Sequence, residues 1–190
     1  MARWEPDARL RLVRAAIDLY AEQGYEVTTV AQVAERAGLT KATFFRHFPD
    51  KREVLFAGQE HHSTLLAEGA AAAPDGATPL EAVTAALDHA TAAFTPEQRA
   101  WGPRLRAVVA SSAELQERAA FKRAHLAAAL ADALRRRGVP DPTAAVAAEL
   151  GVEAFHRAFD RWGDTTDDRS YGDLARSELH DLHAAATALR

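Results

Sequence analysis

The feature that most constrains the fold is a run that begins at Thr28 and reads TTVAQVAERAGLTKATFFRHFPDK. Thr29 and Gln32 have the spacing of a capping box, which opens a helix, and Thr28 is an equally good N-cap. Gly38 supplies a left-handed turn that other residues adopt only with strain, and Thr40 is suited to cap the helix that follows. The run therefore predicts two short helices joined by a glycine turn.

The second of these helices separates its residues into a buried side and an exposed side. At 100° per residue, Phe44 and Phe48 fall on one side and are expected to anchor the helix. The opposite side carries Ala42, Thr43, Phe45 and Arg46, with Lys41 on the flank. A phenylalanine beside basic residues is unusual on a solvated surface but suits contact with DNA. The arrangement is that of a helix-turn-helix, which places its second helix in the major groove.

The charge of the chain is acidic overall but basic around this helix. A formal net charge of -4 argues against a protein that coats nucleic acid without specificity. Residues 39–52, in contrast, contain Lys41, Arg46, Lys51 and Arg52 against Asp50 alone. A local excess of basic residues in a chain that is acidic overall suits contact with a short DNA site.

The rest of the chain predicts an all-α fold of about nine helices. Alanine is abundant whereas β-branched and aromatic residues are sparse, which favours helix over sheet. A first helix is expected to end at Gly24, and a fourth to run from Lys51 to about Ala72. Residues 74–79 read as a connector, after which the apolar spacing predicts a fifth helix that includes Phe94.

The last two predicted helices carry long apolar stripes. The stripes consist of Val152, Phe155, Phe159 and Trp162 on one helix and Ala175, Leu179, Leu182 and Ala186 on the other. Seams of this kind exceed what packing within one chain needs, so we expect them to form a homodimer interface.

Several functional classes have no support in the sequence. No run of eighteen or more apolar residues predicts a membrane span, and the N-terminus lacks the apolar core of a signal peptide. The absence of cysteine fits a cytoplasmic protein. Motifs for nucleophilic or metal-assisted catalysis are absent, and Glu60, His61 and His62 lack metal-ligand spacing. We therefore expect no enzyme, no metal and no cofactor.

Residues 8–56, roughly a quarter of the chain, resemble the DNA-binding domain of the TetR (tetracycline-repressor) family of bacterial transcriptional regulators. The residues that meet the family's pattern are Thr28, Thr29, Val33, Ala34, Ala37, Gly38, Leu39, Thr40, Ala42, Thr43, Phe44, Phe45, His47, Phe48 and Lys51, with Val54-Leu55 nearby. The resemblance implies that residues 1–50 form a DNA-binding domain. Residues 51–190 would then form a helical regulatory and dimerisation domain, linked by the helix from 51 to about 72.

The resemblance also implies a set of DNA contacts. They are Thr28, Thr29, Thr40, Lys41, Ala42, Thr43, Phe45, Arg46, His47 and Lys51. Two of them depart from the usual pattern: Ala42 stands where many members have glycine, and Phe45 where most have tyrosine. These departures affect which DNA sequence is read rather than whether DNA is bound. By its angle His47 packs inward as readily as it binds, and Arg3, Arg9 and Arg11 read as a basic arm or as solvated surface.

For the remainder of the chain, the resemblance implies a small-molecule pocket enclosed by helices four to seven. Candidate lining residues are Phe94, Trp101, Arg104, Phe121, His125 and Phe155. The expected function is that of a ligand-responsive, one-component repressor that binds a palindromic operator as a dimer. The alternative is a helical ligand-binding or scaffold protein whose helix-turn-helix no longer binds DNA.

Overall fold

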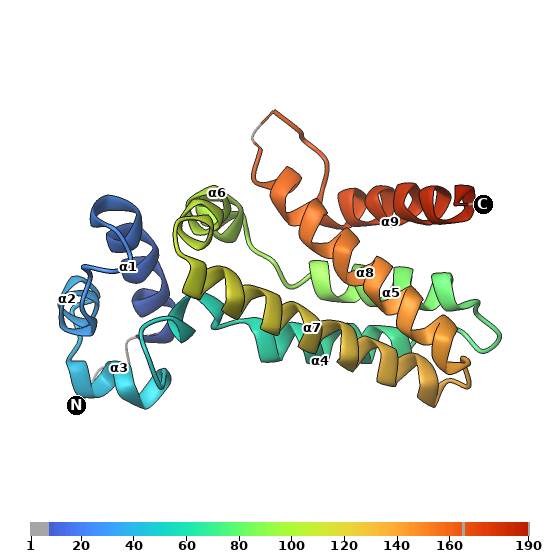
Figure 1. Cartoon of the computed structure of the whole chain (residues 1–190), viewed down its shortest axis with the longest axis horizontal. Coiled ribbons are helices and arrows are strands. Elements are labelled where there is room, and N and C mark those ends of the chain that lie inside the picture. Colours follow the sequence, from blue (N-terminus) through green and yellow to red (C-terminus); the bar gives the residue numbers. More distant parts are fainter. Residues whose placement is uncertain (1–7, 165, 190) are drawn as a thin grey trace. The chain divides into compact units, whose positions relative to one another are not determined.

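The computed structural model describes residues 8–164 and 166–189, and in this part of the chain the fold is all-α (Figure 1). The elements are α1 (Ala8–Gln23), α2 (Val30–Arg36), α3 (Lys41–His47), a 3₁₀ turn η1 (Glu53–Phe56), α4 (Gln59–Ala71), α5 (Pro79–Thr91), α6 (Pro96–Ala110), α7 (Ala113–Arg136), α8 (Asp141–Trp162) and α9 (Tyr171–Ala188). The predicted fold class and helix count are confirmed for the described residues. None of the helices described is both long and apolar enough to cross a membrane.

The chain divides into two compact units, here named the head and the body. Among the described residues, the head contains 8–57 together with Arg104–Ala120, and the body contains Gly58–Pro103 together with 121–164 and 166–189. The boundaries in α6 and α7 fall inside continuous helices. The functional division after residue 50 that the sequence suggests stays a prediction.

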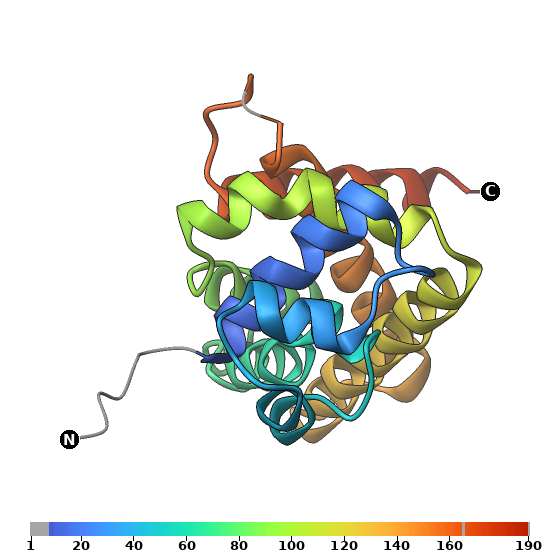
Figure 2. The same cartoon turned by 90° about the vertical axis from the view of Figure 1, so that its left-hand side faces the viewer.

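In the head, α1, α2 and α3 lie across one another around a small core (Figure 2, blue to cyan). The side of α1 that the apolar spacing predicts is buried at Val13, Ile17 and Tyr20. Phe44 is fully buried and Phe48 is 2% exposed, so the predicted anchor of α3 is confirmed. Packing of short helices such as α2 and α3 depends on this shared core, because isolated helices of this length are marginal in water.

The predicted helix from Lys51 to about Ala72 is wrong at its start, because α4 begins only at Gln59. The Asp50 carboxylate accepts hydrogen bonds from the backbone N–H groups of Arg52 and Glu53, at 3.0 and 3.1 Å, so the predicted cap is present. It opens a 3₁₀ turn in which the consecutive residues Val54 and Leu55 are both buried. A 3₁₀ turn spaces residues at about 120°, which lets these two neighbours pack beside α1.

In the body, α4 and α5 pack closely along their lengths, and α5 also packs against α8 and α9. The buried core is rich in leucine and alanine, as at Leu66, Leu87 and Leu130. The two helices α4 and α5 approach each other closely at Gly69. A Cβ atom added there would lie 2.7 Å from the Cβ of His89 and 2.8 Å from the Ala85 carbonyl oxygen. The helix backbones therefore meet where a side chain has no room.

We expect Gly69→Ala to destabilise the body by about 1–3 kcal/mol, the usual cost of overpacking. Alanine gains about 1 kcal/mol over glycine in helix propensity, but backbone atoms of α5 have to move to admit its methyl group. Urea denaturation followed by circular dichroism measures the difference. Thr64→Ala, on the exposed side of α4, is the matched control and is expected to be neutral. Unchanged or greater stability of Gly69→Ala would contradict this packing.

Candidate nucleic-acid interface

The entry to α2 is built as the capping box predicts. The Thr29 hydroxyl oxygen accepts the backbone N–H of Gln32 at 3.3 Å, and the Gln32 side-chain oxygen accepts the backbone N–H of Thr29 at 2.8 Å. Thr28, the alternative cap, is 2% exposed, and its hydroxyl donates to the Gly24 carbonyl oxygen at 2.7 Å. The structure therefore selects Thr29, which is exposed, and the phosphate contact predicted for the Thr28 side chain has no geometric support.

The turn between α2 and α3 is set by Gly38, whose φ of 66° lies in the left-handed region. The space that a Cβ would occupy is filled by the Arg11 guanidinium at 2.7 Å, which also donates to the Ala37 carbonyl oxygen at the end of α2. Thr40 then caps α3, because its hydroxyl accepts the backbone N–H of Thr43 at 3.1 Å. These contacts fix the angle between the two helices.

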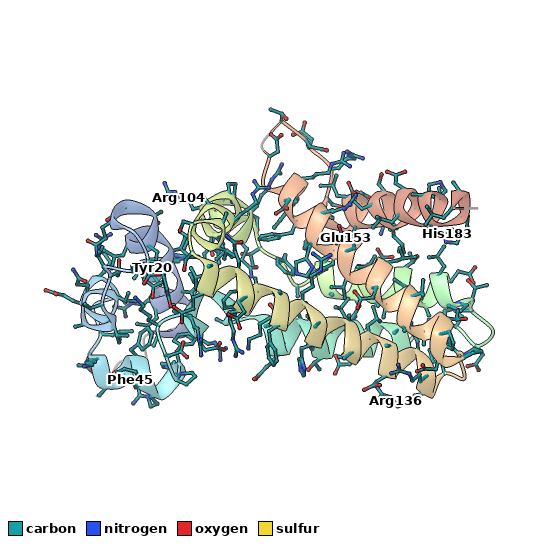
Figure 3. The ribbon with its side chains drawn as sticks, viewed as in Figure 1. Tyr20, Phe45, Arg104, Arg136, Glu153 and His183 are labelled. Atoms are coloured by element: carbon teal, nitrogen blue, oxygen red, sulfur yellow. The ribbon has the colours of Figure 1, made fainter. Side chains whose placement is uncertain are left out.

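The outer side of α3 carries Lys41, Ala42, Phe45 and Arg46, all exposed. The Phe45 ring is 46% exposed (labelled in Figure 3), and the Lys41 ammonium lies 5.9 Å from its centre. Neither Lys41 nor Arg46 forms a salt bridge with any described residue. A helix that presents two unpaired cations and an aromatic ring to solvent has charge and apolar surface available for a polyanion.

His47 lies at the end of α3 and faces the core more than the solvent. Its Nε2 atom is buried and has no hydrogen-bond partner in the described chain, and its ring lies 6.3 Å from that of Phe48. Of the two interpretations that the sequence leaves open, the structure favours packing.

Lys51 is also turned inward. Its ammonium donates to the carbonyl oxygens of Tyr25 and Glu26 at 2.9 and 3.3 Å and lies 4.1 Å from the centre of the Tyr25 ring. The Tyr20 hydroxyl donates in turn to the Lys51 carbonyl oxygen at 2.8 Å. Lys51 thus joins the residues just before α2 to those just after α3. Its predicted phosphate contact stays a prediction, while its role within the head is visible.

Glu114, in the first turn of α7, completes this arrangement. Its carboxylate accepts the Tyr25 hydroxyl at 3.2 Å and the Arg52 guanidinium at 3.3 Å. Burial and the neighbouring Glu114 raise the pKa of the Tyr25 phenol, so the hydroxyl stays protonated and able to donate. We call the set Tyr20, Tyr25, Lys51, Arg52 and Glu114 the clasp. Further links between residues 104–120 and the rest of the head are Arg104–Asp18, Ser112–Glu26 and Arg118–Glu53.

The clasp is the part of the site that sequence reasoning missed. Its members other than Lys51 and Arg52 belong to no recognisable motif, and Glu114 is 89 residues from Tyr25. The sequence carries only an indirect signal, the presence of Tyr20 and Tyr25 in a domain with a small core, because a tyrosine that becomes buried requires a hydrogen-bond partner.

Comparison with known proteins decides the family. The sequence profile described as "Bacterial regulatory proteins, tetR family" matches residues 12–57, which contain α2, α3 and η1 and most of α1. Residues 12–57 therefore form a DNA-binding domain of the TetR family. Its helix-turn-helix is accordingly that of a TetR-family transcriptional regulator.

Other HTH-type transcriptional regulators agree with this assignment. TcmR, an HTH-type transcriptional regulator of Streptomyces glaucescens, is 38% identical over 79 residues, which are 42% of this chain and 35% of TcmR. The match spans 35% of TcmR and as little as 18% of another curated relative, YerO of Bacillus subtilis.

Solved structures show the shared fold. A TetR-family regulator from Syntrophomonas wolfei superposes with a TM-score of 0.61 at 15% identity, over 96% of both chains. FadR of Thermus thermophilus, a TetR-family repressor solved in complex with lauroyl-CoA, superposes with a TM-score of 0.53 at 23% identity, over 92% of this chain and 93% of FadR. At these identities the likeness concerns the fold alone.

The residues predicted to line an effector pocket do not all gather in one place. Phe94 and Phe155 are in contact, with ring centres 5.8 Å apart. Phe121 is 61% exposed and His125 is exposed on α7, whereas Arg104 (labelled in Figure 3) pairs with Asp18 of α1 at 2.9 Å. Trp101 is half-buried, with an indole N–H that lacks a partner among the described residues. As a set, the pocket stays a prediction.

Phe94 corrects the sequence analysis in another respect. The apolar spacing assigns it to the fifth helix, but α5 ends at Thr91 and Phe94 lies in the connection to α6. The Thr91 hydroxyl donates to the Leu87 carbonyl oxygen within the last turn, and Pro96 prevents continuation of the helix. Phe94 instead enters a group of rings that we call the aromatic cluster. It consists of His62, Phe94, Phe155, Phe159, Trp162 and Tyr171.

His62 makes the stability of the body dependent on pH. Burial, with smaller effects of His61 and His156, lowers the pKa of His62 to about 4, against about 6.5 in the unfolded chain. The unfolded state therefore binds the proton more readily. The stability that neutral His62 provides is complete above about pH 6.5 and is lost as the pH falls towards 4, by up to about 3 kcal/mol.

We expect His62→Gln to lose less unfolding free energy than the wild type between pH 7 and pH 4.5, as measured by urea denaturation. His61→Gln is the control, since His61 is the exposed neighbour and should keep the wild-type dependence. If the unfolding free energy of His62→Gln and of His61→Gln depended on pH in the same way, His62 would not be the titrating group.

The predicted dimer residues are largely used within the protomer. Val152, Phe155, Trp162, Ala175 and Leu179 are each at most 8% exposed in the body, so the expectation of surplus apolar surface does not hold for these five. Phe159, Leu182 and Ala186 are half-buried and retain surface that a second protomer would cover. The dimer itself stays a prediction.

Proposed function

We propose that this TetR-family regulator is a ligand-responsive repressor that binds a palindromic operator as a homodimer. The observation that carries the proposal is the outer side of α3, where Lys41 and Arg46 are exposed and unpaired within the described chain beside the exposed ring of Phe45. The caps and the glycine turn hold this side in a fixed orientation. Preorganised cations on a helix are what major-groove recognition requires.

In the proposed complex, Thr29 and the start of α2 approach one phosphate, and Thr40 and Thr43 approach the backbone at the start of α3. Lys41 and Arg46 meet base edges or flanking phosphates. Phe45 lacks the phenolic hydroxyl that most family members have at this position. It provides an apolar contact to sugar or to a thymine methyl, and Ala42 is small enough to allow close approach.

The rival is a helical ligand-binding or scaffold protein without DNA binding. Selection of the purified protein against random-sequence duplex DNA separates the two. An enriched inverted repeat with half-sites about one helical turn apart is expected, since dimers of this motif span about 34–36 Å between recognition helices. Recovery of unenriched DNA would favour the rival, and a single enriched half-site would contradict the dimer.

For the dimer we propose the half-buried part of α9 as contact surface. Leu182 and Ala186 are four residues apart on one side of this helix, and neither is needed in full by the protomer core. Leu182→Asp combined with Ala186→Asp is therefore expected to give folded monomers by light scattering. Val146→Asp, at a 58% exposed position of α8, serves as control and should stay dimeric. A dimer that survives the double change would place the interface elsewhere.

The switch is proposed to act by a shift of population between two states. A ligand changes operator affinity only by as much as its affinities for the two states differ. FadR, a repressor solved with lauroyl-CoA, supports a ligand-responsive body in this fold. The setting proposed for the protein is the cytoplasm, with no metal or cofactor.

A further inference from the structure

The aromatic cluster is organised around one ring that belongs to a loop. Phe94, in the connection between α5 and α6, contacts all five other rings. They come from α4 (His62), α8 (Phe155, Phe159 and Trp162) and the start of α9 (Tyr171). The centre-to-centre distances run from 4.7 Å for His62 to 6.1 Å for Trp162. A loop residue thus fills a cup whose wall is formed by three helices.

The rings of the wall also pack against one another. Trp162 and Tyr171 are stacked at 5.2 Å with an interplanar angle of 15°. The Tyr171 hydroxyl donates to the Phe155 carbonyl oxygen at 2.8 Å, which ties α9 to α8. Phe155, Trp162 and Tyr171 are each at most 8% exposed. These inner rings therefore contact one another in addition to Phe94.

The outer rings reach solvent. Phe94, Phe159 and His62 are all half-buried. The loop around Phe94 is held by two long turn hydrogen bonds, from Ala93 to Ala90 at 3.4 Å and from Phe94 to Thr91 at 3.2 Å. Phe94 is therefore a partly exposed ring on a connection between helices.

His62 gives the cup one polar group. Its ring is stacked on Phe94 at an interplanar angle of 24°, and its two ring nitrogens form no hydrogen bond with any described residue. Its lowered pKa means that the imidazole is neutral at physiological pH, so it has one N–H donor and one acceptor nitrogen available. The cluster therefore provides a ligand with aromatic ring faces for stacking and with one hydrogen-bonding group, the His62 imidazole, beside them.

We propose that the aromatic cluster is the effector site, and that the effector is a planar aromatic compound with a hydrogen-bonding substituent that takes the place of Phe94. The inference rests on the proposed ligand response of the body. Phe94 acts as a plug: its ring occupies in the free protein the position in which the effector stacks against Phe155, Trp162 and Tyr171. His62 orients the substituent of the ligand.

The position of Phe94 in the chain gives its displacement a consequence. The helix α6 begins two residues later, and its second half belongs to the head, where Arg104 pairs with Asp18. Release of Phe94 changes the start of the helix that carries Arg104, the partner of Asp18 in α1. A ligand that binds only when the plug is out therefore discriminates between two conformations, as an effector must.

The test uses 2-naphthol as probe and its saturated counterpart decahydro-2-naphthol as the non-planar match, with full-length protein and isothermal titration calorimetry. The wild type is expected to bind 2-naphthol at least about tenfold more tightly than the saturated alcohol. Phe94→Ala removes the plug and should increase affinity for 2-naphthol about tenfold or more. His62→Phe keeps a ring but loses the hydrogen bond, so affinity should fall about tenfold. Val27→Ala, at a 66% exposed position of the head, should change nothing.

Failure to detect binding of 2-naphthol by the wild type would overturn the proposal. So would equal affinities of Phe94→Ala for the planar and saturated probes, because an apolar cavity made by truncation accepts either. The probe is expected to change the tryptophan fluorescence of the protein. Loss of this change in Trp162→Phe, with the change kept in Trp101→Phe, would support the assignment. The reverse pattern would contradict it. None of these measurements involves DNA, so they stand or fall independently of operator binding.

Discussion

An increase of salt concentration from about 50 to about 200 mM is expected to weaken operator binding by about 10³–10⁵, if the dimer makes about six to ten phosphate contacts. Arg46→Ala should reduce this loss by about tenfold where Arg46 contacts phosphate, since a dimer then loses two such contacts and the salt slope falls by about 0.9 for each. The reason lies in α3: Arg46 is exposed and has no salt-bridge partner among the described residues, so its charge is available. Fluorescence anisotropy with the selected duplex measures both quantities.

The same experiment separates two roles for Arg46. If it reads a guanine, Arg46→Ala costs about 1–3 kcal/mol of binding and relaxes specificity at one base pair. Arg36→Ala is a matched control, because Arg36 lies on α2 and already pairs with Glu22 at 2.8 Å. Unchanged affinity and an unchanged slope after Arg46→Ala would remove Arg46 from the interface. We expect Arg46→Ala to leave the stability of the folded state unchanged, because an exposed side chain without partners contributes little to stability.

Local rules explain why so much of the head could be predicted. The capping box at Thr29, the left-handed Gly38 and the cap at Thr40 each involve residues no more than three apart, so sequence spacing alone specifies them. Phe44 and Phe48 follow from helical periodicity in the same way. The recognition helix is therefore readable from sequence because its geometry is determined by its near neighbours.

Contacts between residues far apart in sequence could not be predicted from local spacing. The angle count places Phe94 in phase with α5, but the destination of its ring is set by α8 and α9, more than 60 residues away in sequence. The apolar stripe of α8 was interpreted as surplus because periodicity counts apolar faces without showing what covers them. In the structure, α5 and α9 pack on α8, and only the half-buried residues remain for a partner.

Lys51 shows how family resemblance and geometry lead to different expectations for one residue. The resemblance implies a phosphate contact, whereas the structure directs the ammonium to two carbonyl oxygens and a tyrosine ring inside the clasp. Hydrogen bonds from a charged group contribute about 1.5–3 kcal/mol each, and a cation–π contact about 0.5–2 kcal/mol. These contacts therefore favour the inward position of the Lys51 ammonium over an outward position in contact with a DNA phosphate.

We expect Lys51→Met, which keeps an apolar stem, to lower the unfolding free energy by about 2–4 kcal/mol. Operator affinity should fall as well, because residues 25–29 lose their link to the end of α3, but the salt slope should stay near the wild-type value. Urea denaturation and binding titrations at several salt concentrations measure the two effects. Amide hydrogen exchange should show reduced protection in residues 25–29.

The pattern for Lys51 is the reverse of that for Arg46, which makes the two variants controls for each other. Tyr25→Phe tests the clasp from the other side: it retains the ring beneath the ammonium but loses the hydrogen bond to Glu114. A smaller loss of stability than in Lys51→Met is expected. If Lys51→Met instead leaves stability intact and lowers the salt slope by nearly two, the side chain turns outward to phosphate on DNA, and the clasp belongs to the free protein alone.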